Sequence, residues 1–163
     1  MKLVYLVKGL PGHPLHPPLT DVTIGAYAFA TVAAVLSKAG VADRGAASAW
    51  WLALVVALAS TALTATTGFV DWIDLEWGSA RWRTATLHMT AMLCASGVFL
   101  AAALVGHHAY VQQRVSTVGL VLTVVGFAVL ALGGWLGGAV VFVHGTRVVG
   151  SSASVSPDSR RTR

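Results

Sequence analysis

The chain has 163 residues, of which 56% are hydrophobic and only 10% are charged. Soluble domains carry roughly 25% charged residues, so this composition excludes an ordinary water-soluble domain and favours a single membrane domain. The net charge of +5 comes without a basic patch interleaved with aromatic residues, which argues against a nucleic-acid partner. The single cysteine, Cys94, excludes an intrachain disulfide.

Residues 1–18 are predicted to lie at the membrane interface rather than to cross the bilayer. Their first apolar run is short and is interrupted by Lys8, which does not fit a cleaved signal peptide. Three prolines follow within residues 14–18, and prolines at this density predict a rigid, non-helical loop. This loop carries His13 and His16, whose imidazole rings it would present with little loss of conformational entropy.

Four apolar segments follow, each suited to crossing about 30 Å of hydrocarbon. The predicted spans are residues 19–37, 47–70, 84–105 and 115–143. In the second span, polar residues recur at helical spacing and predict a stripe that faces other helices: Ser60, Thr64, Thr67 and Asp71. Residues 19–148 are therefore expected to form an all-α, integral membrane four-helix bundle, and residues 149–163 a disordered basic tail.

Four spans place both termini on one side of the membrane. That side carries most of the basic residues: Lys2, Lys8, Arg81, Arg83, Arg147, Arg160, Arg161 and Arg163. The other side carries Lys38, Arg44 and Arg114. Because cytoplasmic segments are enriched in Lys and Arg, both termini are predicted to be cytoplasmic.

Histidines and one acid gather at a single predicted depth of this bundle, near the cytoplasmic boundary. Two precede the first span, the acid ends the second, one begins the third and one ends the fourth: His13, His16, Asp71, His88 and His144. Ionisable residues within or beside spans are costly and usually mark sites or pathways. The pattern therefore predicts a site at this level.

A b-type haem is the interpretation that uses these residues best. His88 and His144, from different helices, would be its axial ligands, with His16 as the leading substitute. Gly137 and Gly133 lie on one face of the last helix and would leave room for the porphyrin. A haem with both axial positions filled suits electron transfer, whereas catalysis would need an open position. The residues leave open whether the protein is an enzyme.

Other residues would support the haem. Arg81 and Arg147 would pair with its propionates, and Asp71 would orient a ligand imidazole through a hydrogen bond. His13 would be an alternative ligand, a propionate partner or a proton carrier.

Two further interpretations stay open. His16, His88 and His144, with His13 and Asp71, would also suit a non-haem zinc, iron or copper ion. Alternatively, the histidines form polar contacts between helices, and the chain is a structural membrane anchor without a cofactor.

Two motifs resemble those of a bacterial family of four-helix membrane proteins. They are His-Pro-Leu-His-Pro at residues 13–17 and Gly-Trp-Leu-Gly-Gly at residues 134–138, the latter followed by His144 and Gly145. The resemblance covers about residues 9–148. The polar positions of the family's motifs correspond to His13, His16, Asp71, His88 and His144.

Some members of that family are fused to Rieske-type iron–sulfur domains. The resemblance therefore implies electron transfer through a membrane haem, in a small subunit or accessory of a redox complex. It also implies a location in the bacterial cytoplasmic membrane and a separate iron–sulfur or other redox membrane protein as the partner. The chain departs from the family at Ala139 and Phe142, where relatives often have a polar residue and a tyrosine. The missing polar groups would affect a proton relay more than the ligation of a haem.

Overall fold

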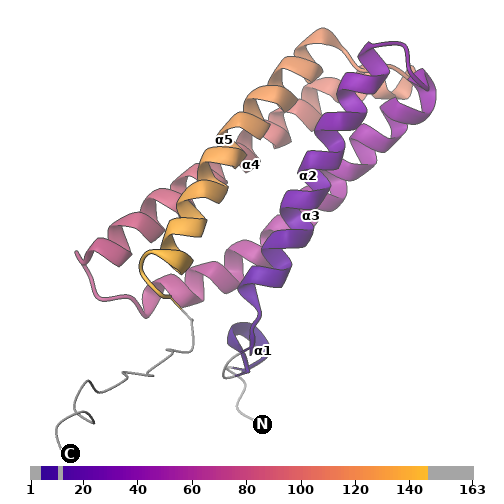
Figure 1. Ribbon diagram of the computed structural model, residues 1–163. Coiled ribbons are helices and arrows are strands. Elements are labelled where there is room, and N and C mark those ends of the chain that lie inside the picture. The colour runs from indigo at the N-terminus through magenta and orange to yellow at the C-terminus, as the bar shows by residue number, and fades with distance from the viewer. Residues whose placement is uncertain (1–4, 11–12, 147–163) are drawn as a thin grey trace, which may run out of the picture.

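The computed structural model describes residues 5–10 and 13–146, and its four long helices form an elongated antiparallel bundle (Figure 1). Each is long and apolar enough to cross a membrane, which confirms the predicted all-α, four-span class. In chain order the elements are α1 (Tyr5–Lys8), β1 (Gly9–Leu10), β2 (His13–Pro14), α2 (His16–Lys38), α3 (Asp43–Ile73), α4 (Ala80–Val111) and α5 (Thr117–Phe142).

The proline-rich segment is partly helical, which differs from the expectation of a loop. The two short strands form an antiparallel hairpin in which Leu10 pairs with His13. However, α2 already begins at His16, so Pro17 and Pro18 occupy its first turn. Proline is tolerated there because the N–H groups of a first turn have no intrahelical acceptor. His16 is therefore held on a rigid helix and not on a loop.

α2, α3 and α4 extend beyond the predicted spans, whereas α5 lies within the span predicted for it. α4 continues to Val111, so His107 and His108 belong to its last turns and not to a loop. Ser79 and Ser116 begin α4 and α5, and each accepts a hydrogen bond from a backbone N–H three residues later. Such N-caps satisfy one of the amide groups that every helix leaves unpaired at its start.

The core is built from large aromatic rings placed against small residues. Tyr27 of α2 and Phe99 of α4 are fully buried and stack with ring centroids 4.0 Å apart. Trp50 of α3 is also fully buried and lies against Gly106 and Gly119. Close packing of this kind holds membrane helices together, because hydrocarbon gives no hydrophobic driving force between them.

The outer surface of the bundle is apolar. In the most apolar window of each long helix, only 28% of the residues are buried. Large side chains point outward instead, such as Leu63, Leu87 and Leu104, which are 62%, 59% and 68% exposed. A surface of this kind is expected where the helices meet lipid.

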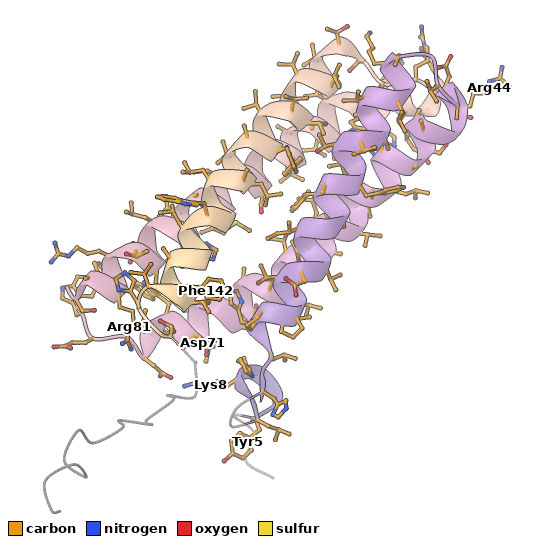
Figure 2. The ribbon with its side chains drawn as sticks, in the orientation of Figure 1. Tyr5, Lys8, Arg44, Asp71, Arg81 and Phe142 are labelled. Carbon is orange, nitrogen blue, oxygen red and sulfur yellow. The ribbon has the colours of Figure 1, made fainter. Side chains whose placement is uncertain are left out.

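The two ends of the bundle differ. Tyr5, Lys8, Asp71, Arg81 and Phe142 all lie at one end, whereas Arg44 lies at the other (Figure 2). We call the first the terminal end, because both described ends of the chain lie there. That the terminal end faces the cytoplasm remains a prediction from charge. The predicted tail, residues 149–163, lies outside the described residues.

Candidate functional site: a cavity lined by two histidines

A cavity of about 400 Å³ lies between α2, α3 and α4 in the terminal half of the bundle. Its size falls within the roughly 300–1,000 Å³ that is typical of ligand pockets. Two of the predicted site residues, His16 and His88, line it together. Its other walls are made of threonines from α2 and α3, methionines from α4, and apolar residues such as Phe69 and Val70.

His16 is held by contacts to α3. Its Nδ1 lies 3.0 Å from the Thr64 carbonyl oxygen and 3.2 Å from Thr67 Oγ1. A carbonyl oxygen only accepts hydrogen bonds, so Nδ1 carries the proton and donates it to Thr64. The ring packs on Gly68, where an added Cβ would lie 2.6 Å from His16 Cε1. Position, orientation and tautomer of this imidazole are therefore all fixed by α3.

His88 is held in the same way by α5. Its Nδ1 lies 2.7 Å from the Gly133 carbonyl oxygen, to which it donates. Its ring packs on Gly137, where an added Cβ would lie 2.9 Å from His88 Cε1. Gly137, which the sequence predicted to make room for a porphyrin, makes room for the histidine ring instead.

The two histidines occupy equivalent positions in two similar helical hairpins, α2–α3 and α4–α5. In each hairpin the imidazole donates to a backbone carbonyl on the second helix and packs on the glycine four residues after that carbonyl. Tyr27 and Phe99, which stack on each other, each follow the histidine of their own hairpin by eleven residues. Contact between equivalent residues is the mark of an approximate two-fold arrangement. The cavity thus receives one imidazole from each half of the chain.

Donation through Nδ1 leaves the lone pair of each ring on Nε2. Within the described residues, neither His16 Nε2 nor His88 Nε2 has a hydrogen-bonding partner. Metal-ligating histidines are usually oriented in this manner, because the hydrogen bond to one ring nitrogen fixes the tautomer in which the other coordinates. Chemically, the site offers two neutral nitrogen ligands to one cavity.

The walls of the cavity differ in polarity. On the α2–α3 side, Thr23 Oγ1 lies 3.0 Å from Ser60 Oγ and 2.9 Å from Thr64 Oγ1. The Tyr27 hydroxyl lies 2.9 Å from Thr61 Oγ1 and forms a hydrogen bond with it. This hydroxyl network also links the two helices. On the α4 side, the lining beside His88 and Ser96 is thioether and apolar: Met89, Met92 and Leu93.

The remaining predicted residues do not line the cavity. His144 is half-buried, and its Nε2 lies 3.0 Å from Thr84 Oγ1 instead. His13 and Arg81 are exposed, and Arg147 lies outside the described residues. Asp71 lies one turn after Gly68, at the terminal end of α3 (Figure 2). Of the predicted ligands, the structure therefore brings together His88 and the substitute His16, not His88 and His144.

Several residues of the site escaped the sequence analysis. Gly68, Met89 and Met92 were not predicted to belong to it. The signal that could have found Gly68 is the equal pairing of one histidine with one glycine in each half of the chain. The methionines had no such signal, because a helical sequence does not reveal which apolar residues face a cavity.

A metal site built only from His, Cys, Asp and Glu side chains has little support in this arrangement. Within residues 5–10 and 13–146, no three or more His, Cys, Asp or Glu side chains are grouped so that they could hold a metal ion. Structural zinc sites need four such ligands and catalytic ones three. Two imidazoles instead suit a group that brings most of its own ligands.

Comparisons with known proteins agree with the fold. Searches of curated proteins and of solved structures return no match. Residues 12–150 match one protein family, which is described as "Predicted membrane protein (DUF2231)". That match spans the His-Pro-Leu-His-Pro motif at residues 13–17, all four long helices and both cavity histidines. The chain belongs to this DUF2231 family of membrane proteins.

Proposed function

We propose that the protein binds one b-type haem in this cavity and transfers electrons, as a small subunit or accessory of a redox complex in the bacterial cytoplasmic membrane. The observation that carries the proposal is the pair of equivalent imidazoles, His16 and His88, with Nδ1 engaged and Nε2 available. When bound, haem supplies a one-electron couple whose potential depends on its axial ligands and surroundings.

The residues present fit a haem in three respects. His16 and His88 come from the two halves of the bundle and line one cavity, so both would be able to hold a group bound there. Both rings are preorganised by a hydrogen bond to a backbone carbonyl and by packing on a glycine, so little conformational entropy is lost on ligation. Apart from His88 and Ser96, the lining from α4 is thioether and apolar, which suits the faces and edges of a porphyrin.

The backbone carbonyls of Thr64 and Gly133 have a further role in this proposal. By accepting from Nδ1 they raise the basicity of the opposite ring nitrogen, which strengthens it as a ligand. Because these acceptors are backbone atoms, side-chain substitution at Thr64 would not remove one of them. The orientation of the two imidazole rings therefore depends on the helix backbone and not on side-chain acceptors.

Copper is the alternative with a specific observation in its favour. Met89 and Met92 line the same cavity as His16 and His88. Thioether and imidazole ligands together are typical of Cu(I) sites, because thioethers are soft ligands. A structural anchor without a cofactor is the third possibility, and the same experiment separates all three.

The test is an absorption spectrum of detergent-purified protein, before and after dithionite reduction, with elemental analysis of the same sample. The chain should be produced with ample haem. We expect sharp bands that shift on reduction and about one iron per chain. His16→Ala and His88→Ala should each abolish the bands, whereas the control His107→Ala, which alters an exposed residue at the other end of α4, should keep them.

Three results would contradict the haem proposal. A colourless sample with stoichiometric copper would favour the copper site. A colourless sample without metal would leave the anchor. Bands that survive both His16→Ala and His88→Ala would show that any haem is held elsewhere.

A further inference from the structure

A second pocket lies at the end of the bundle opposite the terminal end. Its volume is about 410 Å³, and it lies between the α2–α3 turn and the α4–α5 turn. Unlike the histidine cavity, it is lined mainly by charged and amide side chains, among them Lys38, Asp43, Arg44, Gln112 and Arg114.

Three cations and one acid surround this pocket. Lys38, Arg44 and Arg114 come from the end of α2, the start of α3 and the α4–α5 turn, and Asp43 is the only carboxylate among them. The formal charge of the lining is therefore clearly positive, and an anion is the ligand that it would attract. Cations gathered from three segments onto one pocket repel one another, so an anion between them would also relieve that repulsion.

Two of the three cationic side chains make hydrogen bonds beside the pocket. Lys38 Nζ donates to Thr117 Oγ1 at 3.0 Å, and this hydrogen bond joins the end of α2 to the start of α5. The Arg114 guanidinium donates to Gln112 Oε1. These contacts keep two of the cations at the rim of the pocket instead of leaving them free in solvent.

The backbone of both turns is held in an uncommon conformation around the pocket. Ala42 and Gln113 have positive φ angles of 51° and 59°, one in each turn. Among the non-glycine residues described, these are the two with positive φ. Such residues cost of order 1 kcal/mol or more and tend to cluster where function requires a particular shape. Here they adjoin Asp43, Gln112 and Arg114, which line the pocket.

The position of the pocket along the bundle identifies the class of anion. All four long helices begin or end around it, so it lies at the level where spans leave the hydrocarbon and lipid phosphates are found. If the terminal end is cytoplasmic, as predicted, these cations lie on the opposite side of the membrane, where short loops usually contain few Lys and Arg residues. A ligand on that side accounts for their presence there.

We propose that this pocket binds the phosphate group of a phospholipid headgroup. Lys38, Arg44 and Arg114 would contact the phosphate oxygens, and Asp43 would accept a hydrogen bond from a headgroup hydroxyl or ammonium. The proposal is independent of the haem, because the two pockets share no residue. A lipid held here would link the two turns and so stabilise the packing of the two hairpins.

The test is lipid binding by the full chain in detergent, counted by native mass spectrometry during titration with phosphatidylglycerol. Lys38→Gln and Arg114→Gln, made singly and together, remove charge from the pocket. The matched control, Arg81→Gln with Arg83→Gln, removes the same charge from the terminal end. We expect the double pocket variant to bind the first lipid at least tenfold more weakly, and the control to bind as the wild type does.

A second arm separates lipid from free phosphate by adding inorganic phosphate to the lipid-saturated protein. Failure of millimolar phosphate to displace the lipid supports a headgroup site. Charge-dependent binding of phosphate without binding of lipid would overturn the lipid assignment. Equal lipid binding by pocket and control variants, with thermal stability unchanged, would overturn the site itself.

Discussion

His88 packs its imidazole ring on Gly137 so closely that no side chain fits between them. A Cβ at position 137 would lie 2.9 Å from Cε1 and 3.0 Å from Nδ1 of the histidine. Real Cβ atoms almost never approach another heavy atom below 3.0 Å. The glycine therefore determines where the ring sits, and with it the direction of Nε2.

Gly137→Ala and Gly68→Ala should displace His88 and His16 respectively and weaken haem binding at least tenfold. The control is Gly97→Ala, since a Cβ at Gly97 meets no atom within 4 Å. Alanine is favoured over glycine in a helix by about 1 kcal/mol, so the control should be neutral or slightly stabilising. The haem-to-protein ratio after purification measures the effect. Equal haem retention in all three variants would argue that Gly68 and Gly137 do not position the two histidine rings for haem binding.

His144→Ala should keep the haem, in contrast to His88→Ala. The sequence alone assigned His144 as a ligand, but its Nε2 is engaged with Thr84 at 3.0 Å and it does not line the cavity. Loss of this hydrogen bond should cost about 0.5–1.5 kcal/mol of stability. Reduced-minus-oxidised spectra and thermal unfolding in detergent measure the two effects separately. Loss of the haem spectrum from folded His144→Ala protein would restore the original ligand pair.

Gly106→Ala should be the most destabilising of the glycine substitutions in the core. Its Cβ would lie 2.2 Å from Trp50 Cη2, and overpacking of this kind typically costs about 1–3 kcal/mol. Combining it with Trp50→Phe should give less destabilisation than the sum of the two single changes, because the smaller ring leaves room for the methyl group. Thermal unfolding of the four proteins tests this coupling, and strict additivity would contradict the packing described.

The orientation in the membrane can be tested with single cysteines at the two ends of the bundle. In a Cys94→Ser background, Arg44→Cys and Arg81→Cys place exposed thiols at opposite ends (Figure 2). If the terminal end is cytoplasmic, a membrane-impermeant maleimide added to spheroplasts should label position 44 and spare position 81 until the cells are lysed. The reverse pattern would show that the distribution of basic residues had predicted the orientation wrongly.

The ion pair between Lys8 and Asp74 should contribute little to stability. It ties the N-terminal segment to the end of α3, but the two side chains are 22% and 54% exposed. Pairs of this kind usually contribute less than about 1 kcal/mol and are screened by salt. A double-mutant cycle with Lys8→Ala and Asp74→Ala should give a coupling in that range, which falls as the salt concentration rises. A larger, salt-independent coupling would indicate a more rigid attachment.

The fold was readily predicted from this sequence because a membrane imposes strong constraints. Backbone groups in hydrocarbon must satisfy one another, so an apolar segment of sufficient length has to be helical. Helix ends were harder to predict. Pro17 and Pro18 indicated a loop, yet they are accommodated in the first turn of α2, where no hydrogen bond is lost.

The site was predicted only in part, for a physical reason. Hydropathy gives the depth of a residue in the membrane but not the rotation of its helix, so all four histidines near the terminal end seemed equivalent. Rotation depends on side-chain packing, which turns His88 into the cavity and leaves His144 beside Thr84. The inward stripe on α3 was predictable because Thr64 and Thr67 repeat at helical spacing, and both are buried.

Trp50, near the end of the bundle opposite the terminal end, fixes the position of α4 and α5 along α3. Its ring fills the spaces left by Gly106 and Gly119, and its Nε1 donates to Thr123 at 3.0 Å. α4 and α5 therefore cannot slide past α3 by one helical turn, about 5.4 Å, without expelling this ring. His88 lies some 27 Å along α4 from Gly106 at 1.5 Å per residue. Packing at the opposite end of the bundle thus determines how far along the helix axis His88 lies relative to His16. The Nε2 atoms of the two rings are far from the residues that determine this alignment.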